Sequence, residues 1–218
     1  MYTHNKDFKT KGKPLSETGK ALILVHGRGA TAPSILDLAN YLPVQDFTLF
    51  APQATNNSWY PYSFMAPEAQ NQPALDSALK QLDELVKSIL EQGLKSEDLY
   101  FVGFSQGACL ISEYAARNAQ KYGGLLIFTG GLIGEKVDTN RYKGDFAGTP
   151  VLITTGDPDP HVPVSRIEET VEVMDKLGAI VTKKIYPGRP HTILQEELDL
   201  ASQLIKLSNN DLSNGDRG

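Results

Sequence analysis

The stretch Leu99–Gly107, which reads Leu-Tyr-Phe-Val-Gly-Phe-Ser-Gln-Gly, decides the fold of this chain. Its first four residues are typical of a buried strand, and after Gly107 the apolar residues return at helical spacing. A strand, a tight turn with glycine two residues before and two after a serine, and then a helix form the context of a nucleophile elbow at Ser105. Side chains at Gly103 and Gly107 would collide with the neighbouring strand and helix. The competing interpretation is a glycine-flanked turn without chemical use.

Length and composition indicate one globular domain. The chain has 218 residues, 40% of them hydrophobic, and a formal net charge of −5. This charge, together with the lack of a Lys/Arg cluster, argues against a nucleic-acid partner. One cysteine, Cys109, excludes an internal disulfide and fits a reducing compartment, where we expect it to be a small buried apolar residue. The first twenty residues are polar and no long apolar run follows, so we expect a cytoplasmic protein without stable membrane insertion.

The order of elements predicts an α/β protein with a doubly wound, mainly parallel sheet and helices on both faces. Apolar strand-like runs alternate with helical patterns between residues 21 and 207. Residues 1–20 form a polar N-terminal arm that could hold a short edge strand, and 208–218 are predicted to be a disordered tail. Because ligands bind beyond the carboxyl ends of parallel strands, the polar clusters that follow each strand should share one edge of the sheet.

The base that activates Ser105 can be sought among four histidines. His4 lies in the polar arm, and His26 precedes a glycine-rich turn where a structural role is expected. His161 follows Asp159 by two residues, which makes it difficult for that carboxylate to orient it. His191 follows the last strand in a turn shaped by glycine and proline, and we predict that it is the general base.

The acid of the triad is Asp157 or Asp159, both of which follow the strand 151–154. A turn with side-chain hydrogen bonds explains one of them, and we select Asp159 for the triad, with Asp157 bracing the loop. The order Ser105, Asp159, His191 differs from the order in unrelated serine proteases. A metal site built on the two aspartates and His161 is the weaker alternative, because the extended loop does not converge and no second cluster completes a shell.

An oxyanion formed at Ser105 requires backbone donors. One is the amide of Gln106, and the other is expected from Gly27-Arg28-Gly29 after the first buried strand, with the Arg28 N–H as donor. Phosphate binding by this loop is disfavoured, because Ala32 stands where the third glycine of a dinucleotide motif belongs and the lysine of a P-loop is missing.

Four motifs resemble the phospholipase/carboxylesterase family of α/β-hydrolases: His26-Gly27-x-Gly29, Gly103-Phe104-Ser105-Gln106-Gly107-Ala108, Gly156-x-x-Asp159-x-x-Val162-Pro163 and Gly188-x-x-His191. The resemblance covers residues 21–205. It implies an α/β-hydrolase fold with Ser105, Asp159 and His191 as the triad and the amides of Arg28 and Gln106 as the oxyanion hole. His-Gly-Arg-Gly-Ala looks more like bacterial esterases of this family than like its acyl-protein thioesterases.

The loop 56–65 follows a strand and is rich in aromatic residues. We expect Trp59, Tyr60 and Phe64 to form one wall of the substrate pocket and Leu132 to form the opposite wall; a satellite core is the alternative. The segment 134–149 is short and polar, and therefore predicts that there is no large lid and that the site is open.

These observations predict a serine carboxylesterase that acts on short- to medium-chain esters through an acyl-enzyme and needs no cofactor or metal. Its partner is a small-molecule ester, and the chain is a monomer or a homodimer. The alternatives are an acyl thioesterase or lysophospholipase with the same triad, and a non-catalytic binding protein on the same fold.

Overall fold

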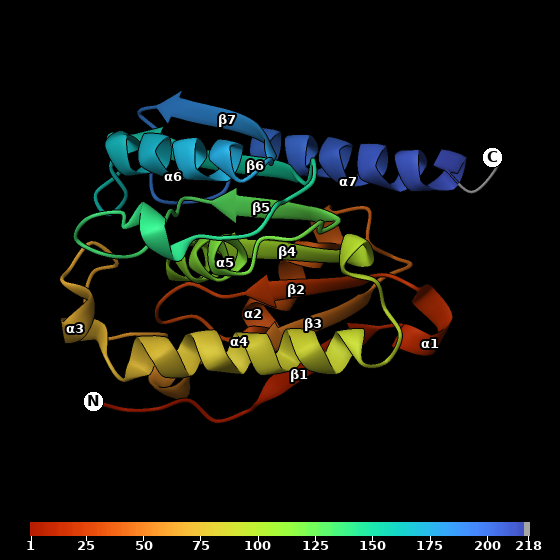
Figure 1. The fold of residues 1–218 in the computed structure, drawn as a ribbon, viewed down its shortest axis with the longest axis horizontal. Helices are drawn as coiled ribbons and strands as arrows, with labels where there is room; N and C mark the ends of the chain where they lie inside the picture. The colour runs from red at the N-terminus through yellow and green to blue at the C-terminus, as the bar shows by residue number, and fades with distance from the viewer. Residues whose placement is uncertain (216–218) are drawn as a thin grey trace.

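The computed structural model describes residues 1–215, with side chains for residues 1–208. Within them, seven strands form one sheet in the order β1-β3-β2-β4-β5-β6-β7 (Figure 1). The strands are β1 (Phe8–Gly12), β2 (Ala21–Val25), β3 (Thr48–Pro52), β4 (Leu99–Phe104), β5 (Gly124–Phe128), β6 (Pro150–Asp157) and β7 (Ile180–Pro187). The α-helices are α1 (Leu15–Thr18), α2 (Ala32–Leu36), α3 (Glu68–Asn71), α4 (Ala74–Leu90), α5 (Gln106–Arg117), α6 (Val164–Lys176) and α7 (Gln195–Gly215). Short 3₁₀ turns are η1 (Asp37–Tyr41), η2 (Thr55–Asn57), η3 (Ser96–Asp98) and η4 (Thr139–Arg141).

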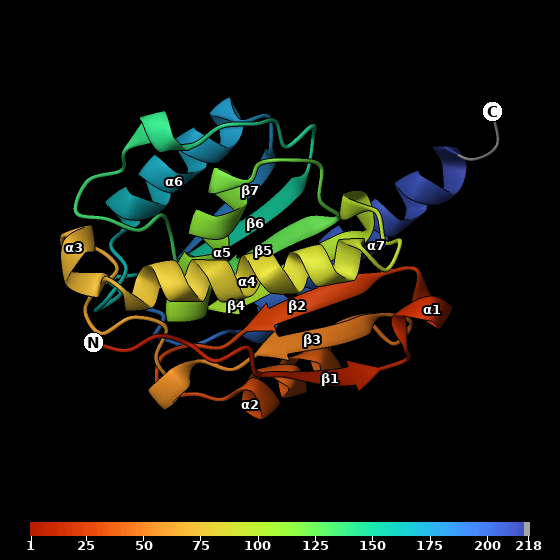
Figure 2. The ribbon, with the colours of Figure 1, turned by 60° about the horizontal axis from the view of Figure 1, so that its bottom comes forward.

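The sheet is parallel except at one edge, where β1 pairs antiparallel with β3. Alternate residues of the central strands face opposite layers of helices. One layer packs β2 residues such as Ile23 against α4, α5 and α6, and the other packs Leu24 and its neighbours against α2 and α7. Figures 1 and 2 show these two layers on either side of the sheet. Burial on both faces explains why Ala21–Val25 is a continuous apolar run. The predicted doubly wound α/β fold is confirmed.

Two domain boundaries differ from the sequence prediction. Strand β1 lies inside the segment 1–20, which was expected to hold at most a short edge strand, so the sheet begins before residue 21. All five residues of β1 are exposed, and its pairing with β3 relies on backbone hydrogen bonds that leave no apolar pattern. Helix α7 runs to Gly215, so the backbone of 208–215 is helical where a disordered tail was predicted. Residues 216–218 of that tail lie outside the described residues.

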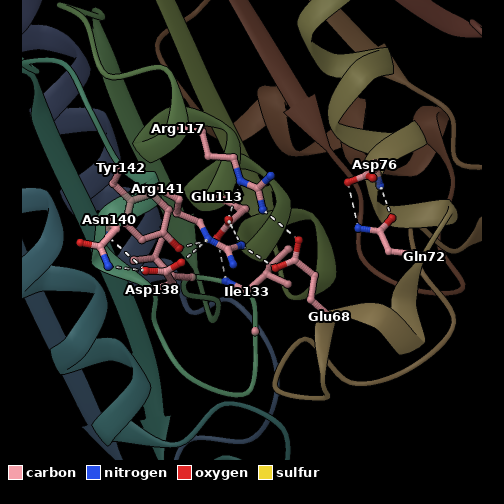
Figure 3. Close-up of polar contacts among 12 residues, drawn as sticks. Glu68, Gln72, Asp76, Glu113, Arg117, Ile133, Asp138, Asn140, Arg141 and Tyr142 are labelled. Carbon is pink, nitrogen blue, oxygen red and sulfur yellow. Dashed lines mark hydrogen bonds and ion pairs between the residues drawn. The ribbon is translucent and has the colours of Figure 1, made fainter.

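The segment after β5 is fastened to the body of the protein by a buried carboxylate. Glu113 on α5 is fully buried and accepts hydrogen bonds from the Ile133 N–H (2.9 Å) and the Tyr142 hydroxyl (2.9 Å). It also pairs with Arg117 and Arg141, and both arginines reach Glu68 on α3 (Figure 3). The segment thus follows the surface of α5 with one 3₁₀ turn, and 134–149 contains no helix of the size of a lid.

The turn between β4 and α5 depends on the close approach of backbone to backbone. A Cβ atom at Gly107 would lie 2.1 Å from the Val25 carbonyl oxygen, and one at Gly103 would lie 2.7 Å from the Ala108 Cα. Gly130, at the end of β5, would meet the Ala108 Cβ at 2.5 Å. These distances are far below van der Waals contact, and the atoms in the way belong mainly to the backbone. Helix α5 can therefore lie against the ends of β2, β4 and β5 only because these positions are glycine.

We predict that Gly107→Ala destabilises the protein by about 1–3 kcal/mol or more, because inserting a methyl group into a packed interior has a cost in this range. Gly27→Ala is the matched control, because its Cβ would meet neighbouring atoms only at 3.3–3.4 Å. Urea unfolding measures both. Equal stability of the two variants would contradict this account of the turn.

Candidate active site

Ser105 stands at the turn between β4 and α5 in a backbone conformation that side chains rarely adopt. Its φ of 54° and ψ of −118° lie outside the allowed regions for most residues, and its N–H donates to the Phe128 carbonyl oxygen at 2.9 Å. The strained turn lifts the hydroxyl above the carboxyl edge of the sheet, at the first turn of α5. The amides of that turn favour negative charge.

His191 and Asp159 complete a hydrogen-bonded chain with Ser105. The His191 Nε2 lies 2.8 Å from the Ser105 Oγ, and its Nδ1 lies 2.9 Å from the Asp159 Oδ2. These two hydrogen bonds assign the tautomer of His191: its Nδ1–H donates to the Asp159 carboxylate, and its Nε2 accepts the proton of the Ser105 hydroxyl. The register of β6 with β7, which pairs Asp157 with Pro187, starts the two loops that carry Asp159 and His191 side by side.

The surroundings keep Asp159 ionised. Its side chain has no exposed surface, and its Oδ1 accepts the N–H groups of His161 (2.9 Å) and Val162 (3.0 Å). Burial raises the pKa of this carboxyl, but the hydrogen bonds from His191 and from these two amides outweigh burial, so its pKa is below the ordinary value. Asp157 is exposed, and its carbonyl oxygen accepts the Gly188 N–H at 2.8 Å, which braces the loop before His191.

The loop after β2 lies directly against the nucleophile. A Cβ placed on Gly27 would be 3.4 Å from the Ser105 Cβ, and Arg28 and Gln106 line the same cavity as Ser105. Both residues therefore lie close to Ser105, and their N–H groups as oxyanion donors stay a prediction. The side chain of Gln106 has a separate structural role. It is buried, its Oε1 accepts the Trp59 N–H at 2.9 Å, and its Nε2 donates to the Tyr60 carbonyl oxygen at 2.8 Å.

A cavity of about 750 Å³ opens in front of Ser105. Its walls come from the loops after β2, β3, β6 and β7 and from the start of α5, as the following residues show: Arg28, Tyr60, Pro61, Tyr62, Ser63, Phe64, Ser105, Gln106, Cys109, Pro160, His161, Val162 and His191. Burial raises the pKa of the Cys109 thiol to about 12, so this thiol is uncharged at neutral pH. Tyr60 and Phe64 lie where the sequence predicts them.

Trp59 and Leu132 do not line this cavity, which corrects the prediction for both. Trp59 is fully buried; its indole N–H donates to the His26 carbonyl oxygen at 2.8 Å and its ring lies against the His26 ring. Leu132 packs in a small cluster between α5 and α6. Aromatic and apolar residues in loops serve the core as readily as a pocket, and the loop sequence does not indicate which way each side chain turns.

The two histidines outside the cavity hold the backbone that follows β3. His26 is buried; its Nδ1 contacts the Gly27 carbonyl oxygen at 2.8 Å and its Nε2 accepts the Ala54 N–H at 3.1 Å. In the N-terminal arm, the His4 Nε2 contacts the Trp59 carbonyl oxygen and the Nδ1 accepts the Thr55 N–H. Each ring accepts one backbone N–H and therefore is neutral. Burial lowers the pKa of both rings.

A buried ion pair that the sequence pattern does not indicate anchors the His191 loop. Arg189 and Glu197 have almost no exposed side-chain surface, and their charged groups lie 3.5 Å apart. The guanidinium also donates to the Thr129 hydroxyl at 2.6 Å and to the Thr192 carbonyl, while the carboxylate accepts from the Thr154 hydroxyl and the Leu194 N–H. The loop is thus tied to β5, β6 and α7. The only sequence signal was an arginine two residues before His191.

Neither a metal cluster nor a membrane span is found in the part of the chain that the structure describes. No three His, Cys, Asp or Glu side chains gather there at metal-binding distance, and none of its helices is long and apolar enough to cross a bilayer. His161, considered as a metal ligand, lines the mouth of the cavity, with its ring edge-on to the His191 ring at 5.0 Å.

Comparison with known proteins agrees with this geometry. A model of the family named Phospholipase/Carboxylesterase matches residues 12–209. The crystal structure of a phospholipase/carboxylesterase from Dyadobacter fermentans is 55% identical, with a TM-score of 0.93 over 94% of this chain and 99% of the other. A probable SOBER1-like carboxylesterase of Arabidopsis thaliana is 25% identical over 85% of this chain and 77% of its own. Acyl-protein thioesterase 1 of Gibberella zeae is 32% identical over 55% of this chain, and that alignment spans about half of the relative (52%).

We predict that acidification below pH 6.5 weakens the fold through His4 and His26. Their folded pKa values are lower than the unfolded value of 6.5, so between the two the unfolded chain binds more protons. Stability is fully present above pH 6.5 and falls as the pH drops toward the folded pKa values. Urea midpoints from pH 8 to pH 5 measure this, and His4→Gln should reduce the slope. A midpoint that rises on acidification would contradict it.

For the buried pair, we predict that Glu197→Leu destabilises the protein by about 3–5 kcal/mol, because it leaves the Arg189 guanidinium buried without its counter-charge. The double variant Glu197→Leu, Arg189→Met should regain most of this loss, since no buried charge remains. Urea unfolding of the three proteins tests the pairing. A double variant that is no more stable than the single one would refute it.

Proposed function

Since the chain belongs to the phospholipase/carboxylesterase family and is a hydrolase of the esterase type, we propose that it hydrolyses short- to medium-chain carboxylic esters through an acyl-enzyme on Ser105. The observation that carries the proposal is the chain of hydrogen bonds from Ser105 through His191 to the buried carboxylate of Asp159, at 2.8 and 2.9 Å. This chain supplies a nucleophile, a base and the group that orients the base.

In the proposed reaction, His191 Nε2 takes the Ser105 proton as Oγ attacks the ester carbonyl. The amides of Arg28 and Gln106 bind the oxyanion, and Asp159 stabilises the imidazolium. His191 then gives the proton to the leaving alcohol, which departs and leaves the acyl group on Ser105. Water, activated by His191, attacks the acyl-enzyme and releases the acid. Each step uses groups of this chain and needs no cofactor.

The size and walls of the cavity support a short or medium acyl chain. The cavity of about 750 Å³ is bounded by Phe64 and Val162. Segment 134–149 is fastened to α5 through Glu113 and adds no apolar cover that would shelter a long chain. A small-molecule ester therefore suits the site better than packed lipid. The buried single cysteine, Cys109, supports a cytoplasmic place of action.

A thioester is the second candidate substrate. The relative from Gibberella zeae is named an acyl-protein thioesterase, and the same triad would attack a thioester carbonyl. A non-catalytic binding protein on this fold is the candidate from another class. The complete triad geometry argues against it, because a binding site has no need of a histidine held between a serine and a carboxylate.

We predict that Ser105→Ala lowers kcat on 4-nitrophenyl acetate, butyrate, octanoate and palmitate by roughly 10⁴-fold or more, and that the wild-type rate peaks at the shorter chains. Asp159→Asn should also lose orders of magnitude in kcat, whereas Asp157→Asn, on the same loop with an exposed side chain, should keep near wild-type activity.

To rank the two substrate classes, kcat/KM is measured for the butyryl thioester of a coloured thiol and for the corresponding oxygen ester. Hydrolysis that persists unchanged in Ser105→Ala, or no hydrolysis of any ester or thioester by the wild type, would overturn the proposed function.

A further inference from the structure

We propose that the Arg28 guanidinium selects esters that carry an anionic group, a carboxylate or a phosphate, several bonds away from the scissile carbonyl. This inference rests on the proposed function and adds the chemical class of its substrate. Its basis is the position of one uncompensated positive charge on the wall of the cavity.

The lining of the cavity has an unusual charge balance for this protein. The chain as a whole carries a formal charge of −5, with 26 acidic and 21 basic residues. Among the described residues that line the cavity, however, none is Asp or Glu, and Arg28 alone bears a permanent charge. The Arg28 guanidinium is thus the one permanent charge that these lining residues present to a ligand, and a positive charge in that position attracts anions and disfavours cations.

The Arg28 side chain is held in position although it is exposed. Its Nη1 donates to the Ser58 hydroxyl (2.9 Å) and the Pro61 carbonyl oxygen (2.9 Å), and its Nη2 donates to the Tyr62 carbonyl oxygen (2.6 Å). These bonds fix the guanidinium against the loop that carries Tyr60 and Phe64. A fixed charge loses little entropy when a ligand arrives, so it binds an anion better than a freely moving side chain would.

These partners position the charge without neutralising it. All three acceptors are uncharged oxygens, and within residues 1–208 no carboxylate forms an ion pair with Arg28. Three of its five N–H groups are used in these bonds, which leaves Nε–H and one Nη2–H for a ligand. The carboxylate of Asp159 keeps its charge, but its side chain has no exposed surface and lies behind His191, so it does not pair with Arg28 and does not face a ligand in the cavity.

The backbone and side chain of Arg28 face different parts of one substrate. Its N–H is the proposed oxyanion donor beside Ser105, and its guanidinium lies at the other end of the same residue, next to Pro61 and Tyr62. A substrate whose carbonyl oxygen binds the amide would therefore meet the guanidinium only with a group several bonds farther along. Acetyl and butyryl esters carry no charged group on the acyl chain, so simple test esters would not reveal this preference.

The experiment compares three esters of equal length that differ in terminal charge: mono-4-nitrophenyl adipate, the 4-nitrophenyl ester of adipic acid monoamide, and 4-nitrophenyl 6-aminohexanoate. A second pair, 1-hexanoylglycerol 3-phosphate and 1-hexanoylglycerol, places the anion on the alcohol side. The wild type should hydrolyse an anionic member with kcat/KM roughly tenfold higher than its neutral partner, the effect of one charge-assisted hydrogen bond. The cationic ester should be the poorest, and added salt should reduce the preference.

Arg28 variants separate charge selection from support of the loop. Arg28→Gln should bring the anionic and neutral members of a pair to equal kcat/KM, and Arg28→Lys should keep part of the preference. A purely structural arginine would instead lower the rates for all esters and leave their ratios unchanged, which would overturn the proposal.

The wild-type ratios test the proposal even if a variant does not fold. A preference for the anionic member among the adipate esters or between the two hexanoylglycerol compounds supports the proposal and assigns the anion to the acyl side or the alcohol side, respectively. Equal rates within both pairs, with hydrolysis that still depends on Ser105, would overturn the selection and leave the proposed function intact. Lack of any Ser105-dependent hydrolysis would overturn both the anion selection and the proposed function.

Discussion

The contact between the first turn of α5 and the ends of β2, β4 and β5 is the constraint on which the rest of the structure depends. Gly103, Gly107 and Gly130 lie where a Cβ would come within 2.1–2.7 Å of neighbouring atoms. Their lack of side chains lets the helix begin directly above the sheet and turns Ser105 upward with a positive φ. The nucleophile, the loop after β2 and the first amides of α5 meet there for this steric reason.

Buried polar groups hold the loops that surround Ser105. The register of β6 and β7 places the acid and base loops together, and the Arg189–Glu197 pair ties the base loop to three elements of the core. Gln106 holds the backbone of the aromatic loop at Trp59 and Tyr60, and the His26 carbonyl oxygen accepts the Trp59 indole N–H. A buried polar group without a partner destabilises a fold strongly, so each of these loops has few alternative conformations.

Local patterns predicted the sheet, the two helical layers and the arrangement of Ser105, Asp159 and His191, because strand ends in a parallel sheet meet at one edge. Side-chain direction was not predictable in the same way. Trp59 and Tyr60 are adjacent in sequence, yet only Tyr60 faces the cavity, since a hydrogen bond to His26 draws Trp59 into the core. Strand β1 was foreseen only as a possible edge strand without bounds, and the Arg189–Glu197 pair was missed, because backbone pairing and distant ion pairs leave no periodic signal.

The central claim is that Ser105 becomes covalently acylated. Its most direct test is to mix the protein with 4-nitrophenyl butyrate, quench with acid within the first turnovers, and measure the mass of the peptide that contains Ser105. The account predicts one butyryl group on Ser105 in Asp159→Asn, where slow deacylation lets the adduct accumulate, and none on that peptide in Ser105→Ala. Nitrophenol release by the wild type with the acyl group on another residue, or with no adduct in any variant, would contradict it.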